Sequence, residues 1–162
     1  MGDDEKKLAQ ALIIAMKNEI RVIELYSQCL KRDITSDSRS NIEVVVKDEE
    51  RHMKMLKEFF EKKLQKKLDV SKLKDDSLSS IKNMVIEPYS AHLIDVAMGY
   101  EHREKNHFEK TLASFGSDPE LKELFDKLIE DEVSHIEVLE KERKAIMGQA
   151  FDDFELDLYV RE

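Results

Sequence analysis

Apolar residues recur every three or four positions along four long stretches of the chain, which is the spacing of α-helices that each bury one face. Only 4 Gly and 2 Pro occur among the 162 residues, and 39% of the residues are charged, a composition that favours long helices over turn-rich sheets. The sequence therefore predicts an all-α protein with one core. We expect helices over residues 5–31, 39–67 and 89–115, and a fourth that follows Gly116 and runs to about Met147.

The connections between these helices predict their arrangement. The first two helices are joined by a short connection, which implies antiparallel neighbours, whereas residues 68–88 form a long crossover with one short helix around Leu78–Ile86. Two antiparallel pairs joined by a crossover are the connectivity of a ferritin-like four-helix bundle. We expect this bundle to form one domain over residues 1–148, with residues 149–162 as a C-terminal tail.

Several local signals set the expected helix ends. Gly116 suits the position after the third helix, and Ser117 is expected to cap the fourth helix with Glu120 closing a capping box. Gly148 is expected to end the fourth helix. The tail then alternates apolar and polar residues, which indicates a short strand or an extended arm that packs on a partner subunit; its apolar positions are Phe154, Leu156, Leu158 and Val160.

Each predicted helix places at least one carboxylate on the apolar stripe that should face the core. In the second and fourth helices a histidine follows three positions later, and this Glu-x-x-His spacing puts both side chains on one face, one turn apart. The polar residues on the stripes are Glu19, Glu49, His52, Glu101, Glu104, Glu132 and His135.

Burying several carboxylates costs several kcal/mol each unless they are paired or neutralised, and no Lys or Arg occupies these stripes. Divalent cations would neutralise them, and a donor set of oxygens with two imidazoles suits Fe or Mn better than a structural zinc ion. One Glu-x-x-His on a charged helix usually lies on a solvated face. All four helices together match the known ligand set of ferritin-like di-iron proteins, one Glu from each of two helices and Glu-x-x-His from the other two.

At these positions the sequence resembles the rubrerythrins in their di-iron domain, over about residues 5–147. Glu-x-x-His twice is shared with ferritins, bacterioferritins and manganese catalases, so the extra carboxylate Glu104 is the more specific mark. The matching motifs are Glu19 with Tyr26 seven positions on, Glu49-x-x-His52, Glu101-x-x-Glu104 and Glu132-x-x-His135.

The resemblance implies a centre of two iron ions that, when reduced, gives two electrons to hydrogen peroxide and yields water. It implies that Glu49 and Glu132 bridge the ions, and that Glu104 and His52 alternate at one of them. The other expected ligands are Glu19 and Glu101, with His135 either a ligand of the second ion or a partner of the Glu132 region. Tyr26 and Glu104 are the expected catalytic residues.

Two departures from the family pattern bear on this expectation. Full-length rubrerythrins carry a rubredoxin module with two Cys-x-x-Cys pairs, whereas this chain has a single cysteine, Cys29. Either a separate carrier such as a rubredoxin supplies the electrons, or the protein does something other than turn over peroxide. In addition, Phe108 stands seven positions after Glu101, where the first half of the chain has Tyr26 after Glu19, so only Tyr26 offers a phenol.

Other function classes follow from the same residues or are excluded by composition. A ferritin-like ferroxidase or iron-binding protein, with dioxygen as substrate, and a dimanganese catalase would use the same ligands, and a helical bundle without metal would leave five buried carboxylates unexplained. A net charge of -9 argues against nucleic acid as a partner. Neither a signal-peptide pattern nor a run of about 20 apolar residues occurs, and we expect a cytoplasmic homodimer that does not bind membranes.

Overall fold

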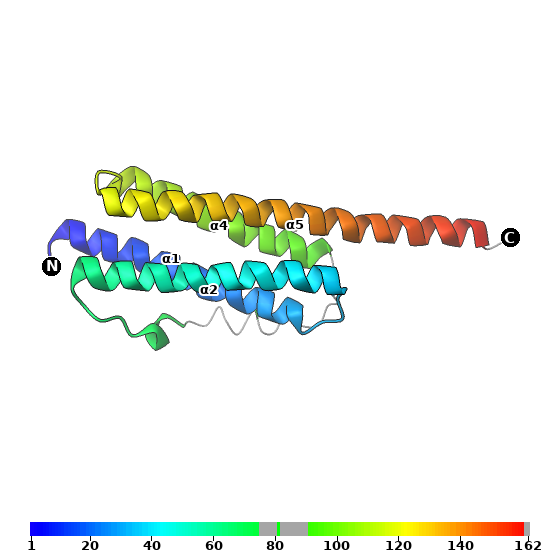
Figure 1. Cartoon of the computed structure of the whole chain (residues 1–162), viewed down its shortest axis with the longest axis horizontal. Coiled ribbons are helices and arrows are strands. Elements are labelled where there is room, and N and C mark those ends of the chain that lie inside the picture. The colour runs from blue at the N-terminus through cyan, green and yellow to red at the C-terminus, as the bar shows by residue number, and fades with distance from the viewer. Residues whose placement is uncertain (75–80, 82–90, 161–162) are drawn as a thin grey trace.

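The structure of the protein is a computed structural model that describes residues 1–74, 81 and 91–160, with side chains as far as residue 148. Within these residues every regular element is a helix and no strand occurs, so the prediction of an all-α bundle is confirmed. Figure 1 shows the long helices lying side by side. The elements are α1 Asp3–Leu30, α2 Ser36–Leu64, the 3-10 helix η1 Val70–Leu73, α4 Ala91–Phe115 and α5 Pro119–Val160.

Both ends of α2 differ from the expected positions, and each end has a local structural cause. Thr35 begins the helix, since its hydroxyl accepts a hydrogen bond from the Ser38 backbone N–H at 3.1 Å. The helix ends at Leu64 because Gln65 adopts the left-handed conformation, with φ 51°. The helix is therefore shifted by three residues from the expected range of 39–67.

The turn between α4 and α5 differs from the expectation in its capping residue. Asp118, and not Ser117, caps α5, because its carboxylate accepts hydrogen bonds from the backbone N–H groups of Glu120 at 3.0 Å and Leu121 at 3.4 Å. Gly116 follows α4 as predicted, but its φ is not positive. A side chain there is excluded because a Cβ would lie 2.5 Å from the carbonyl oxygen of Leu112.

The expected strand or extended arm in the tail is wrong, because α5 continues through Gly148 to Val160. A Cβ at Gly148 would meet nothing within 4 Å, so this glycine neither marks a turn nor makes a close contact. A glycine inside a helix costs about 1 kcal/mol relative to Ala, which neighbouring residues can offset. Figure 1 shows α5 extending past the end of the other helices. Of the expected helix around Leu78–Ile86, only Ile81 falls in the described residues, where it is helical and buried.

Two apolar cores fill the bundle, one toward each end. The first lies around the start of α1 and the end of α2, and it includes Leu12, Met16, Leu56, Phe60, Phe108, Leu121, Phe125 and Leu128. The second lies around the end of α1 and the start of α2, and it includes Val22, Leu25, Tyr26, Ile42, Val45, Ile94, Ala97 and Leu139. On each of the four long helices, buried Glu or His residues lie between the residues of the first core and those of the second.

Side-chain contacts hold α2 against α5 along its length. Ser38 bonds to Glu142, Arg51 to Asp131 and Lys62 to Glu120, so residue numbers rise along α2 as they fall along α5. None of the described helices has both the length and the apolar content that a membrane crossing would need.

Candidate metal centre

The polar layer between the two cores is made of the seven residues that interrupt the predicted stripes. All seven are buried, with His135 the most exposed at 2% of its surface. Four helices contribute to the layer, so residues more than a hundred positions apart in the sequence meet there. Its members are Glu19 from α1, Glu49 and His52 from α2, Glu101 and Glu104 from α4, and Glu132 and His135 from α5.

One half of the layer is centred on Nδ1 of His52. This nitrogen lies 3.4 Å from Glu49 Oε2 and 3.5 Å from oxygens of Glu19 and Glu132. One nitrogen and three carboxylates from three helices therefore face a common point. Ligand atoms of these four residues all lie within 4.8 Å of one another, a spacing suited to one metal ion.

The other half is centred on Nδ1 of His135 and repeats this arrangement. The nitrogen lies 2.9 Å from Glu49 Oε1, 3.4 Å from Glu101 Oε2 and 4.0 Å from Glu132 Oε2. Ligand atoms of these four residues again lie within 4.8 Å of one another. The geometry thus places His135 among the inward-facing donor atoms, as it does His52.

Glu49 and Glu132 belong to both halves, and each turns one oxygen to each imidazole. Glu49 directs Oε2 to His52 and Oε1 to His135, and Glu132 directs Oε1 to His52 and Oε2 to His135. Two carboxylates shared in this way are able to hold two cations side by side.

A test of whether these residues suit metal ions is whether the protein itself satisfies their polar atoms. Eleven buried oxygen and nitrogen atoms of the layer have no hydrogen-bond partner. The short His135–Glu49 approach is an ion pair without hydrogen-bond geometry. Buried polar atoms nearly always have hydrogen-bond partners. This concentration of unpartnered oxygen and nitrogen atoms therefore suits bound cations better than it suits a hydrogen-bond network within the protein. The atoms are both oxygens of Glu19, Glu49, Glu104 and Glu132, Oε2 of Glu101, and Nδ1 of His52 and His135.

The outer nitrogen of each imidazole is held by an aspartate of the opposite helix. His52 Nε2 lies 2.9 Å from Asp131 Oδ2, and His135 Nε2 lies 3.0 Å from Asp48 Oδ2. An imidazole that donates from Nε2 presents a free lone pair at Nδ1, which is the atom that faces the layer.

Sequence reasoning missed these two aspartates, although a signal was present. Each aspartate directly precedes the glutamate of a Glu-x-x-His motif, so α2 and α5 both carry Asp-Glu-x-x-His. The pairing itself was not readable from the sequence, because each aspartate holds the histidine of the other helix.

Tyr26 and Phe108 occupy the two positions compared in the sequence. The Tyr26 hydroxyl is buried and donates a short hydrogen bond to Glu101 Oε1. Phe108 lies in the first core, edge-on to Phe125 at 5.4 Å between ring centroids. Tyr26 therefore reaches the layer across the bundle from α1 to α4, whereas Phe108 serves packing.

Glu104 belongs to neither four-residue group but lies in the same layer. It is 1% exposed and both its oxygens lack hydrogen-bond partners. Burial is the main cause that raises its pKa well above 4.5, and the charges of Glu19 and Glu49 add to it. Glu104 is thus an additional buried carboxylate beside the paired groups.

Burial and mutual repulsion control the protonation of the other carboxylates. Burial raises the pKa of Glu19 and of Glu132 well above 4.5, and burial with the charge of Glu49 raises that of Glu101. Burial also opposes ionisation of Glu49, but contacts with Glu19 and both imidazoles outweigh it and lower the Glu49 pKa. The layer therefore takes up protons that cations would replace.

The two imidazoles shift in the opposite sense to that expected from burial alone. Burial lowers a histidine pKa, but the carboxylates outweigh it and raise the pKa of both His52 and His135 to about 10. The strongest of these contacts come from Glu132 and Glu49 at His52, and from Glu101 and Glu49 at His135.

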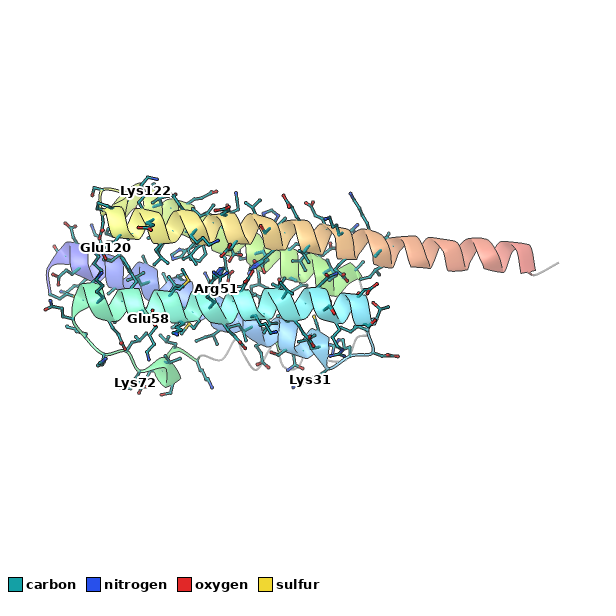
Figure 2. All side chains as sticks on the ribbon, in the orientation of Figure 1. Lys31, Arg51, Glu58, Lys72, Glu120 and Lys122 are labelled. Atoms are coloured by element: carbon teal, nitrogen blue, oxygen red, sulfur yellow. The ribbon has the colours of Figure 1, made fainter. Side chains whose placement is uncertain are left out.

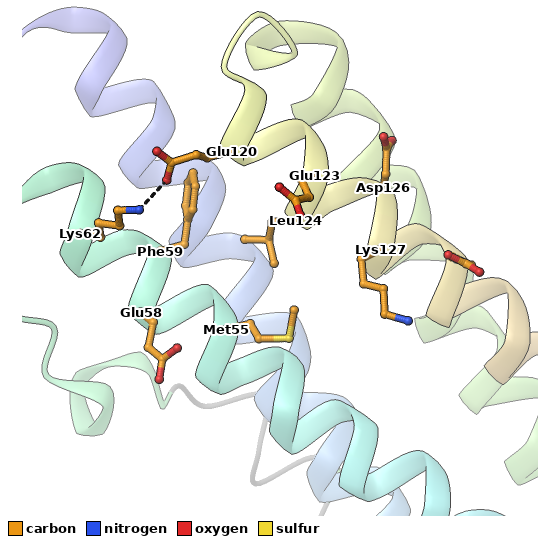
Figure 3. Close-up of a pocket in the computed structure, with 10 residues that line it drawn as sticks. Met55, Glu58, Phe59, Lys62, Glu120, Glu123, Leu124, Asp126 and Lys127 are labelled. Carbon is orange, nitrogen blue, oxygen red and sulfur yellow. Dashed lines mark hydrogen bonds and ion pairs between the residues drawn. The ribbon is translucent and has the colours of Figure 1, made fainter.

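A surface pocket between α2 and α5 is a separate feature. Figure 3 shows its apolar floor of Met55, Phe59 and Leu124, and the ion pair of Lys62 with Glu120 at 2.8 Å on its rim. None of the seven residues of the layer lines this pocket. The seven inward-facing residues of the layer, with their unpartnered buried oxygen and nitrogen atoms, are the stronger candidate for a functional site.

Compared with protein families, curated proteins and solved structures, the chain matches none of them. The likeness to rubrerythrins thus stays an expectation based on residue spacing, and the geometry of the layer is an independent observation.

Proposed function

We propose that this chain is a rubrerythrin-like non-haem di-iron oxidoreductase that reduces hydrogen peroxide to water with electrons from a separate carrier. The observation that carries the proposal is the sharing of Glu49 and Glu132 between two donor groups, each of which has its own imidazole. A mononuclear site would need only one such group. The proposal includes a ferritin-like connectivity, which the short α1–α2 and α4–α5 connections and the long segment between α2 and α4 support.

The donor types support iron, with manganese as the alternative. Carboxylate oxygens outnumber imidazole nitrogens in both groups, and thiolate is absent from them because Cys29 does not belong to either group. Such sets suit Fe or Mn, whereas structural zinc sites favour cysteine and closed tetrahedral geometry. In the proposed centre Glu19 and His52 would hold one ion, and Glu101 and His135 the other.

The remaining residues would serve orientation and proton balance. Tyr26 donates to Glu101 Oε1 and so leaves Oε2 directed to the layer. Burial raises the pKa of Glu104, which suits a carboxyl group that would exchange protons beside the centre. Peroxide reduction consumes two protons and two electrons and yields two water molecules; two ferrous ions bound here would supply the electrons. With one cysteine in the chain, the resupply of electrons is assigned to an external carrier such as a rubredoxin.

The proposal is tested by the reactivity of protein loaded anaerobically with ferrous iron. We expect saturation at two ions per chain, and oxidation that is faster with hydrogen peroxide than with dioxygen, with one peroxide consumed for two ferrous ions. Stopped-flow absorbance measures both rates, and Glu49→Ala, which removes a shared ligand, is the inactive control.

Other outcomes would point to other functions of the same residues. Oxidation by dioxygen as fast as by peroxide would refute the peroxidase and favour a ferroxidase. Copurified manganese with oxygen release from peroxide would favour a catalase. Absence of stoichiometric binding would refute every metal-based function.

A further inference from the structure

The two aspartates that hold the imidazoles are themselves joined by one cation, Arg51. Its Nη2 atom donates hydrogen bonds to Asp48 Oδ1 at 2.9 Å and to Asp131 Oδ2 at 3.1 Å. Asp48 lies on α2 with Arg51, whereas Asp131 lies on α5, so the guanidinium spans the two helices. Figure 2 labels Arg51 where these helices face each other.

These contacts form a continuous hydrogen-bond network between the two imidazoles. It runs from His135 through Asp48, Arg51 and Asp131 to His52, and every link is between 2.9 and 3.1 Å. The exposed fraction of the side chains rises from 3% or less at the histidines to 12% at Asp131, 33% at Asp48 and 44% at Arg51. This hydrogen-bond network therefore lies between the polar layer and the solvent.

We propose that Arg51 is a positioning residue that holds both outer aspartates, and through them fixes both imidazoles with Nδ1 facing the metal ions. This inference rests on the metal centre of the proposed function, and it adds a residue that touches no ligand. Asp48 and Asp131 are partly exposed, so without the guanidinium Asp48 is free to turn toward water, whereas Asp131 keeps its contact with Lys127. Outer partners of this kind typically change metal affinity by about 10- to 100-fold.

The two ends of this hydrogen-bond network, at Asp48 and at Asp131, differ in how strongly they depend on Arg51. Asp131 also accepts a hydrogen bond from Lys127 Nζ at 3.3 Å. Asp48, by contrast, has Arg51 as its one cationic partner apart from His135 within the described residues. Loss of Arg51 is therefore expected to release His135 more than His52.

The direction of the effect separates positioning from simple charge. Arg51 is a cation near a cation site, so removing its charge alone would strengthen metal binding. Positioning predicts the opposite, a weaker affinity. Arg143 is a matched control, since it joins α5 to α4 through Asp95 at 2.7 Å and its side chain is 41% exposed against 44% for Arg51.

The experiment compares the unsubstituted protein with Arg51→Ala, Arg51→Lys and Arg143→Ala. Cobalt(II) affinity is measured by competition with a chelator, and the Nε2–H signals of both histidines are followed by NMR in the zinc(II)-loaded proteins. We expect Arg51→Ala to lower cobalt affinity about tenfold and to speed exchange of both Nε2 protons, that of His135 more. Arg51→Lys should lose less affinity, and Arg143→Ala should change neither quantity.

An affinity loss in Arg51→Ala no larger than in Arg143→Ala would overturn the inference, and so would a change confined to one imidazole. Failure of the unsubstituted protein to bind cobalt would overturn it together with the metal centre. Normal cobalt results in a protein whose ferrous form does not reduce peroxide would refute only the proposed activity.

Discussion

The bundle buries carboxylates in two ways, and the contrast between Glu142 and the polar layer defines the candidate site. Glu142 lies on α5 and is 5% exposed, yet both its oxygens accept hydrogen bonds, from Ser38 Oγ at 2.6 Å and Asn41 Nδ2 at 2.7 Å. Ten residues earlier on the same helix, Glu132 is fully buried and neither oxygen has such a partner.

The difference shows that burial alone does not indicate a metal ligand. A buried carboxylate needs donors, and the protein supplies neutral ones to Glu142 from α2. In the layer it supplies other carboxylates and two imidazole nitrogens that face the same points. The feature that points to cations is therefore the concentration of acceptors without donors.

The largest expected difference is in metal binding itself. Glu49→Ala and Glu132→Ala each remove a residue shared by both donor groups, so each should abolish the binding of two ferrous ions per chain. Glu142→Ala should leave that stoichiometry unchanged, because Glu142 belongs to neither group. Anaerobic titration with Fe(II) measures both. Loss of binding in Glu142→Ala with retention in Glu49→Ala would reverse the distinction.

The second difference is in the dependence of stability on pH when a chelator keeps the protein free of metal. The pKa values of Glu19, Glu104 and Glu132 are raised, and those of the two histidines are raised to about 10. A group with a raised pKa contributes its full stability below its unfolded pKa and loses it as pH rises through the folded value. The free energy of unfolding should therefore fall by about 2 kcal/mol or more between pH 5 and pH 9.

Bound metal should reverse this trend, because the ligands must lose their protons to bind and affinity then rises with pH. Urea unfolding across the pH range, with chelator and with saturating cobalt(II), measures both curves. The lowered pKa of Glu49 acts only at the acid end, where its contribution is lost as pH falls. A stability of the chelated protein that rises from pH 5 to pH 9 would contradict the buried, protonated layer.

A smaller difference concerns the stability of the metal-free variants at one pH. Glu142→Ala leaves Ser38 and Asn41 without their acceptor and should cost about 1–3 kcal/mol. Glu132→Gln replaces a buried carboxyl group of raised pKa with a neutral amide and removes no hydrogen bond, so it should cost less. Urea unfolding in chelator measures the two free energies. Equal costs would show that Glu132 has a donor in solution.

The contrast also explains how much of this could be predicted from the sequence. Helical spacing indicated the four long helices and the seven polar residues, because a Glu or His on an apolar stripe is visible without a structure. The Glu-x-x-His motif singled out Glu132, whereas Glu142 was not considered, because its neutral donors Ser38 and Asn41 lie a hundred positions away in the chain. The Asp48–His135 and Asp131–His52 pairs were missed for the same reason.

Helix ends were predicted less well, for local reasons. At the start of α5 the prediction took Ser117 as the cap, but Asp118 is the residue that reaches the free N–H groups, and which side chain does so depends on backbone angles. At its far end, Gly148 was interpreted as a stop although a glycine only weakens a helix. The alternation from Phe154 onward suggested a strand, yet so short a pattern does not distinguish strand from helix.

Glu101 combines features of the two kinds of buried carboxylate. Removing its neutral donor gives the smallest expected effect. Its Oε1 accepts the Tyr26 hydroxyl, as the oxygens of Glu142 accept neutral donors, whereas its Oε2 has no donor and faces His135. Tyr26→Phe keeps the ring in the second core and removes only the donor. The hydrogen bond contributes about 1 kcal/mol, so cobalt affinity should fall about fivefold with two ions still bound.

Chelator competition measures this change, and the spectrum of bound cobalt(II) reports whether the ligand set is kept. Unchanged affinity would mean that packing alone orients Glu101. Loss of one ion would instead make the phenol essential to the site, since a carboxylate without its neutral donor would then be unable to keep one oxygen turned to the metal.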